Sequence, residues 1–159
     1  MTEITISAEN IKKIGGYLET GDMLCYYHIP TGKVLSAPDP VKYYDMDNEL
    51  WDDVYKEIDE KISECIVFRP LESREGFEIM EAFSENEVDD KVVRARLITA
   101  LSKPKPFGNF NTAVRYDAQV LKAWYAYKTQ RYIDHAKNVV AAYNSQKMLS
   151  EKYDQDKED

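Results

Sequence analysis

Hydrophobic residues recur along the chain at helical and at strand-like spacings, and these spacings predict its elements in order. A first helix is expected to begin after Ser7, a good N-cap residue, and to end near Gly21. A β-hairpin follows, with arms at residues 23–29 and 34–37 on either side of the turn sequence Pro-Thr-Gly-Lys. Residues 65–68 are a further short apolar run, which predicts a third strand.

Three helices are predicted between residues 48 and 101. The first carries an apolar residue at every fourth position among acidic residues, which is typical of a surface helix. The second begins at Ser73, whose hydroxyl can cap it, and the third follows the capping-box spacing of Ser84 to Glu87. The apolar positions are Leu50, Val54, Ile58 and Ile62 in the first, Phe77, Met80 and Phe83 in the second, and Val88, Val92, Val93, Leu97, Ile98 and Leu101 in the third.

The last third of the chain is expected to be a loop and two helices. Pro104 and Pro106 exclude helix there and favour extended conformations for the lysine before each of them. A short helix is predicted over residues 107–116, and a long helix runs from Asp117 to about Gln146. The fold class is therefore α+β, mostly helical, with a small N-terminal antiparallel β-sheet and a long C-terminal helix.

The length of 159 residues fits one domain with its own core. No repeat and no linker-like stretch divides the chain. We expect a single globular domain over residues 1–149 and a polar, frayed tail over residues 150–159, which carry no apolar stripe.

The net charge of −8 conceals a strong asymmetry along the chain. Residues 39–64 sum to −7 and residues 65–90 to −6, whereas residues 91–147 sum to +9. Acidic helices that lie beside basic ones would cancel this field within the molecule, and we favour that interpretation. The alternative is that part of the basic half faces outward and attracts a polyanion.

Composition indicates a soluble, cytoplasmic protein that does not enter the membrane. No charged-then-apolar leader stands at the N-terminus, and no apolar run approaches the ~20 residues that cross a bilayer. Cys25 and Cys65 are the only cysteines, which favours free thiols in a reducing compartment over a disulfide.

No catalytic, metal-binding or cofactor-binding motif appears, so we predict no catalytic residue, no metal and no cofactor. Cys25 and His28 have a spacing that metals use, but no second pair follows, and such positions in a strand point to opposite faces. Adjacent acidic pairs such as Asp52-Asp53 diverge on a helix and indicate a solvated face.

Two groups of residues rise above this background. Arg69, Arg74, Glu75 and Glu78 surround the start of the helix at Ser73, where we expect a structural ion pair and, as an alternative, the carboxylates of an enzyme. The second group is a basic, aromatic loop from Lys103 to Asn111. It could stack on single-stranded nucleic acid or dock a protein. The interpretation we favour is that its two phenylalanines pack inward.

Four segments of the chain follow one another in a characteristic order. They are Glu75 to Phe83, Leu97 to Leu101, Lys105 to Phe110 and Trp124-Tyr-Ala-Tyr-Lys128. Together they resemble the bacterial uncharacterised protein family 0158 (UPF0158). The likeness extends from Leu18 to about Tyr143. It implies no activity, cofactor or catalytic residue. The chain departs from the family at Gly108-Asn109, where relatives often have Arg or a larger residue, and this weakens a role of the loop in phosphate binding.

We therefore predict a non-enzymatic cytoplasmic interaction or regulatory module. Its partner would be an unidentified protein, and the alternative is weak binding of single-stranded nucleic acid. A third hypothesis is an enzyme that uses the carboxylates near Glu75 and Glu78. The candidate contact surface consists of Lys103, Lys105, Phe107, Phe110, Trp124, Tyr125, Lys128 and Arg131.

Overall fold

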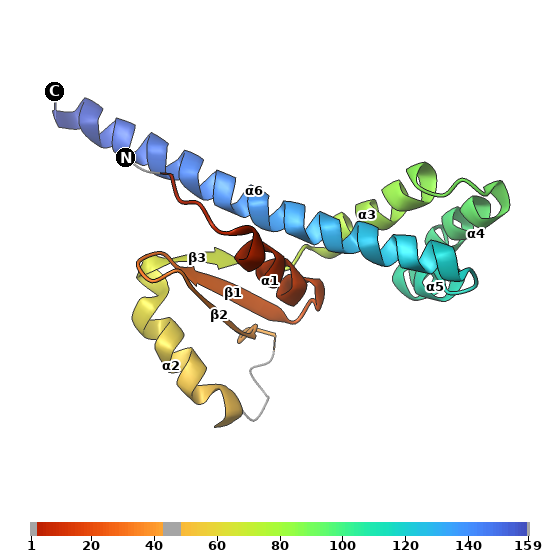
Figure 1. The fold of residues 1–159 in the computed structure, drawn as a ribbon, viewed down its shortest axis with the longest axis horizontal. Helices are drawn as coiled ribbons and strands as arrows, with labels where there is room; N and C mark the ends of the chain where they lie inside the picture. Colours follow the sequence, from red (N-terminus) through yellow and green to blue (C-terminus); the bar gives the residue numbers. More distant parts are fainter. Residues whose placement is uncertain (1–2, 43–48, 159) are drawn as a thin grey trace. The chain divides into compact units, whose positions relative to one another are not determined.

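The computed structural model describes residues 3–42 and 49–158, and the chain divides into two compact units. Unit 1 comprises Met1–Pro70 with Tyr132–Asp159, and unit 2 comprises Leu71–Arg131. Helices dominate both, and the strands form one small sheet in unit 1, which confirms the predicted α+β class (Figure 1). Organisation as one domain stays a prediction.

Unit 1 is built on a three-stranded antiparallel sheet in the order β2-β1-β3. The strands are β1 (Met23–His28), β2 (Lys33–Pro38) and β3 (Cys65–Phe68), close to the predicted positions. The hairpin closes where His28 pairs with Lys33, and the amide of Gly32 donates to the carbonyl of His28 at 2.8 Å. Gly32 has a φ of 70°, which glycine adopts without steric cost.

Helices cover both faces of this sheet. α2 (Asp52–Lys61) follows a 3₁₀ turn, η1 (Glu49–Trp51), and buries Ile58 against Leu24, Tyr26 and Leu35. A second 3₁₀ turn, η2 (Ile62–Glu64), leads into β3. Because successive strand residues point to opposite faces, Cys25 is buried on the other face, where α1 (Ala8–Glu19) packs. This burial on two faces explains why β1 has no polar alternation.

The ends of α1 follow the predicted signals. The Ser7 hydroxyl accepts a hydrogen bond from the Asn10 amide at 3.2 Å, which confirms Ser7 as the N-cap. After the last helical residue, Gly21 has a φ of 82° and its amide donates to Leu18 at 3.0 Å.

The predicted apolar stripe of the acidic helix is wrong at both ends. Leu50 is 85 % exposed and Ile62 is also exposed, whereas Trp51, Val54 and Tyr55 pack around the sheet core beside Ile58. The 3₁₀ turns at both ends rotate the flanking residues off the helical face, so a stripe extrapolated at a constant 100° per residue fails there.

Unit 2 consists of three helices and the first part of a fourth. They are α3 (Ser73–Asn86), α4 (Lys91–Leu101), α5 (Pro106–Val114) and α6 (Ala118–Glu158). Their core contains Phe83, Leu97, Phe110 and Trp124. The helical hairpin of α3 and α4 is as predicted.

Two predicted helix caps are wrong. Glu72, not Ser73, precedes α3, and its side chain makes no cap hydrogen bond. Ser84 lies inside α3, fully buried, and its hydroxyl donates to the Met80 carbonyl at 2.8 Å. The cap of α4 is Asp90, whose carboxylate accepts from two amides of the first turn at 2.8 and 3.2 Å. A serine that bonds back to its own helix is not available as a cap.

α6 continues beyond its predicted end near Gln146, and the predicted frayed tail is helical as far as Glu158. Lysine, glutamate and glutamine in this segment are good helix formers, and each residue added to a helix contributes one more backbone hydrogen bond. Within the described residues, no helix combines the length and the apolar character needed to cross a membrane.

Candidate binding groove

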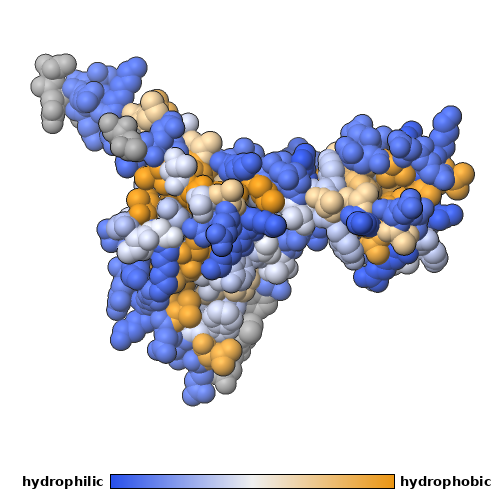
Figure 2. Space-filling model, viewed as in Figure 1, coloured by the Kyte–Doolittle hydropathy of each residue, from blue (hydrophilic) through white to orange (hydrophobic). Residues whose placement is uncertain are grey.

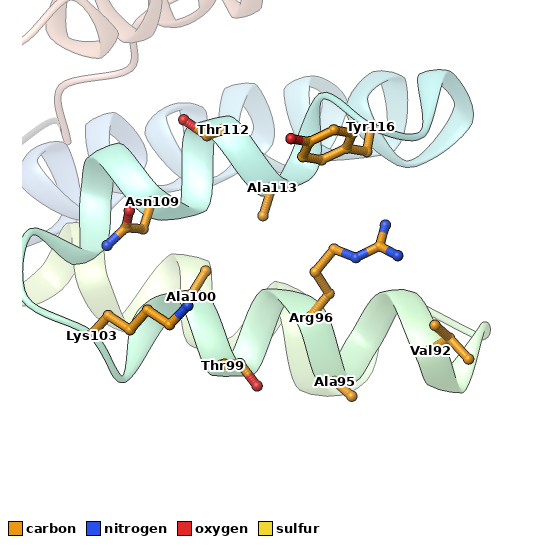
Figure 3. A pocket seen from close by; sticks show the side chains of 10 residues that line it. All are labelled: Val92, Ala95, Arg96, Thr99, Ala100, Lys103, Asn109, Thr112, Ala113 and Tyr116. Carbon is orange, nitrogen blue, oxygen red and sulfur yellow. The ribbon is translucent and has the colours of Figure 1, made fainter.

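α4 and α5 of unit 2 enclose an open groove with a volume of about 420 Å³ (Figure 3). α4 and the residues after it contribute Val92, Ala95, Arg96, Thr99, Ala100 and Lys103. α5 and the residues after it contribute Asn109, Thr112, Ala113 and Tyr116. Most of these side chains are short, and the long ones are those of Arg96, Lys103 and Tyr116.

α4 has apolar residues on more than one side. Leu97 and Leu101 are buried in the core, whereas Val92 is 67 % exposed and lines the groove, and Ile98 is exposed outside the groove. Hydrophobic residues accordingly interrupt the hydrophilic surface over the α4–α5 part of unit 2 in Figure 2. Val92 therefore adds exposed apolar surface to the groove side of α4.

A tight turn sets the position of α5 beside α4. Lys105 adopts a left-handed conformation, with φ and ψ both 58°, so the prediction of an extended residue is wrong. Its carbonyl accepts from the Asn109 amide at 3.1 Å, and the Asn109 side chain donates to the Pro104 carbonyl at 2.8 Å. Pro106 then starts the helix, where a proline costs nothing. These bonds hold Lys105 in a conformation that costs about 1 kcal/mol or more.

An aromatic cluster forms the rigid support beneath the groove. The Trp124 ring lies edge-on to Phe83 and Phe110, with centroids 5.3 Å and 4.9 Å away. Phe110 and Trp124 are buried, so their prediction as contact-surface residues is wrong. Aromatic residues at helical spacing marked the core, as we favoured for Phe110.

The charged side chains that line the groove are all cationic. Its cationic side chains are Arg96, whose guanidinium lies 5.8 Å from the centre of the Tyr116 ring, and Lys103, while no carboxylate belongs to the described residues that line it. Arg94, on the same helix, donates two hydrogen bonds to the Val88 carbonyl at 2.9 and 2.7 Å, so it braces the α3–α4 loop instead. Residues 91–116 contain six lysines or arginines and no acidic residue.

The other predicted surface residues have separate environments. Lys103 and Lys105 are exposed, and Phe107 is partly exposed but rests one side of its ring against Gly76 of α3. On α6, Tyr125 is 55 % exposed. Lys128 and Arg131 are half-buried, and the Arg131 guanidinium lies 4.9 Å from the centre of the Tyr127 ring.

The predicted ion-pair cluster is reduced to one surface pair. Arg74 and Glu78 lie 3.4 Å apart, one helical turn from each other on α3, and both are exposed. Such a pair contributes ~0.3–0.5 kcal/mol. Arg69 belongs to unit 1, where its backbone carbonyl lies 2.8 Å from Nε2 of His135. Glu75 is exposed and, like Glu78, does not line the groove, which gives the enzyme hypothesis no support.

Other reactive side chains of the described chain have structural roles. Burial raises the pKa of the Cys25 thiol to about 12, which removes its nucleophilic form at neutral pH. Asp90 and Asp117 line a second cavity, but each accepts hydrogen bonds from the first turn of a helix. Among the residues with described positions, no three His, Cys, Asp or Glu side chains are placed to hold a metal ion.

Sequence analysis missed the main groove residues, Arg96, Thr99 and Tyr116. One signal was available, because α4 repeats small or apolar residues at Val92, Ala95 and Thr99 in addition to its core positions. The absence of acidic residues between positions 91 and 116 was a second signal, hidden inside the larger basic half.

Comparison with known proteins gives one match. The family model described as Uncharacterised protein family (UPF0158) matches residues 32–158. No curated protein matches the chain, and no solved structure matches it. The match confirms the resemblance found in the sequence and adds no activity to it.

Proposed function

We propose that this chain, which belongs to the uncharacterised protein family UPF0158, is a non-enzymatic, cytoplasmic module that binds another protein. Its contact surface would be the α4–α5 face, which we define as the groove together with Lys103 and Lys105 of the α4–α5 turn and Phe107 in the first turn of α5. Trp124 and Phe110 would support this surface from beneath without touching the partner.

One observation carries the proposal: exposed apolar side chains and cations occur together on the α4–α5 face, and no carboxylate belongs to the described residues that line its groove. Val92 and Tyr116, which is 74 % exposed, offer apolar area, and Arg96 lies over that tyrosine. Tyrosine and arginine are the types of residue that contribute most at protein interfaces. The turn at Lys105 and the core beneath fix the backbone, so a partner would pay little entropy to order this surface.

The experiment is capture of partners from a lysate of the native host cells, with the wild type and two charge-reversal variants as bait. We expect a stoichiometric protein partner with the wild type. The double variant Arg96→Glu with Lys103→Glu should reduce its recovery at least tenfold, because it reverses both groove charges. Lys122→Glu is the matched control, since it reverses an exposed cation of α6 that does not line the groove.

Circular dichroism and thermal unfolding of all three baits establish that the changes leave the fold intact. Equal recovery of every partner by wild type and double variant would contradict the proposed surface. A bait that captures no protein at low or moderate salt would contradict the proposed function itself.

Single-stranded nucleic acid is the second candidate, and the placement of Arg96 beside the exposed Tyr116 ring favours it. Binding through phosphates falls steeply as salt rises. The test is titration of a labelled oligo(dT) and a labelled oligo(rU) at 50 mM and 200 mM salt. Flat, negligible binding of both at 50 mM salt would exclude nucleic-acid binding.

A further inference from the structure

The α4–α5 groove is elongated, since it follows two neighbouring helices for most of the length of each (Figure 3). Its middle is lined by Ala95, Thr99 and Ala113, which are short enough for another backbone to approach closely. A surface of this kind is used by proteins that bind an amphipathic helix, whose apolar side chains enter the groove one turn apart.

The charges along the groove limit what such a helix can carry. Arg96 belongs to α4, whereas Lys103 lies two residues beyond the end of this helix at Leu101, and both line the groove (Figure 3). No described carboxylate lines the groove to neutralise them. A ligand helix with a carboxylate near each end of its groove-facing side would place one beside each cation, while a basic helix would meet like charges.

We propose that the α4–α5 groove binds an acidic amphipathic helix of a partner protein, which carries two separated carboxylates and small or medium apolar side chains on its groove-facing side. This inference rests on the proposed function and specifies its partner. The apolar residues would contact Val92, Ala95 and Thr99 on the α4 side. The carboxylates would set the position of the helix along the groove, because both meet a cation only in that position.

The test is selection from a phage-displayed library of 18-residue helical peptides on the full chain. Apolar-face positions vary among Ala, Val, Ile, Leu and Met, and flanking positions vary among Glu, Gln and Lys. We expect enriched peptides to carry an excess of Glu over Lys at the flanking positions. Titration of a synthesised winner should then give at least tenfold weaker binding to Arg96→Glu with Lys103→Glu, and binding to Lys122→Glu within about twofold of the wild type.

A charge swap in the peptide tests whether its carboxylates contact the two groove cations. The same peptide with both Glu residues changed to Lys should bind the reversed variant better than it binds the wild type. The variant Arg96→Gln with Lys103→Gln, which removes charge without reversing it, should give intermediate affinity for the original peptide. If the charge reversal disturbs folding, this neutral variant still measures how the groove charges affect peptide affinity.

Several outcomes would overturn the inference. These are no enrichment, enrichment without acidic excess, and selected peptides whose affinity ignores both groove variants. Tighter binding of oligo(dT) than of any selected peptide would assign the groove to nucleic acid instead. Self-association of the chain in sedimentation, lost in the reversed variant, would place a second copy there. If partner capture from lysate depends on Arg96 and Lys103 while the library yields no acidic helix, the proposed function stands and this inference alone fails.

Discussion

Gly15 of α1 faces the backbone of Tyr132 in α6, so that a β-carbon on Gly15 would lie 3.4 Å from the Tyr132 carbonyl carbon and 3.3 Å from the next amide nitrogen. At this point the backbones of α1 and α6 approach each other closely, because Gly15 has no side chain to separate them. By helix propensity alone, Gly15 weakens α1, because glycine in a helix interior costs about 1 kcal/mol relative to alanine. In the fold it permits the close approach of α1 and α6.

The adjacent glycines of α1 should consequently respond in opposite ways to alanine. Gly16 has no atom within 4 Å of its would-be β-carbon, so Gly16→Ala should stabilise the protein by ~0.5–1 kcal/mol through helix propensity. Gly15→Ala meets backbone that cannot rotate away, and should destabilise it by about 1 kcal/mol or more. Urea unfolding of both variants measures the difference, and equal stabilisation would show that the helices do not depend on Gly15.

The neighbouring aromatics of α6, Trp124 and Tyr125, should separate core from surface. Trp124→Ala removes the ring between Phe83 and Phe110 and should destabilise the protein by ~3–5 kcal/mol. Tyr125→Ala, at an exposed site, should change the free energy of unfolding by no more than ~0.5 kcal/mol. Chemical denaturation with tryptophan-independent detection by circular dichroism tests this, and a small loss for Trp124→Ala would contradict the packed cluster.

Asn144 of α6 should hold the N-terminal segment of unit 1. Its side chain accepts from the Ile4 amide at 2.9 Å and donates to the Ile4 carbonyl at 3.0 Å. Asn144→Ala removes both bonds and should cost ~1–3 kcal/mol, whereas Asn144→Asp keeps the acceptor and should retain protection of the Ile4 amide. Hydrogen exchange at Ile4 is the measurement. Unchanged protection in Asn144→Ala would show that other contacts hold the segment.

Acid should weaken unit 1 through Glu57. Hydrogen bonds from Lys33 and Lys61, both at 2.7 Å, lower the pKa of this carboxyl from 4.5 to about 2. A lowered pKa in the folded state stabilises the fold above about pH 4.5, and this contribution is lost as the pH falls toward 2. Between these values, the stability of the wild type should fall more steeply than that of Glu57→Gln.

Unfolding curves at several pH values between 7 and 2 provide this comparison. Glu60→Gln is the matched control, because Glu60 is an exposed carboxylate on the same helix. Identical slopes for the wild type and Glu57→Gln would mean that the two lysines do not hold Glu57 in solution.

Local signals predicted the secondary structure well where they act over a few residues. The Ser7 cap, the turn at Gly32 and the proline-limited start of α5 all depend on backbone geometry within one turn. The errors occurred where two local signals compete. Ser84 had the spacing of a cap, but burial inside α3 directed its hydroxyl to the Met80 carbonyl.

The candidate site was predicted only in part for a related reason. The loop lysines Lys103 and Lys105 are exposed, whereas Trp124 and Phe110 are core residues. Aromatic residues next to cations can indicate either an interface or a core edge. Periodicity cannot decide between them unless the partner helix is known.

The sequence by itself determined the helices and strands, the family and the unequal distribution of charge, because these depend on spacing and composition. Tertiary structure alone decided which apolar side of α4 became core and which became the wall of the groove. It also brought Arg96 of α4 together with Tyr116 of the turn between α5 and α6. The physical reason is that burial and electrostatic field arise from side chains far apart in sequence, and packing alone sets their distances.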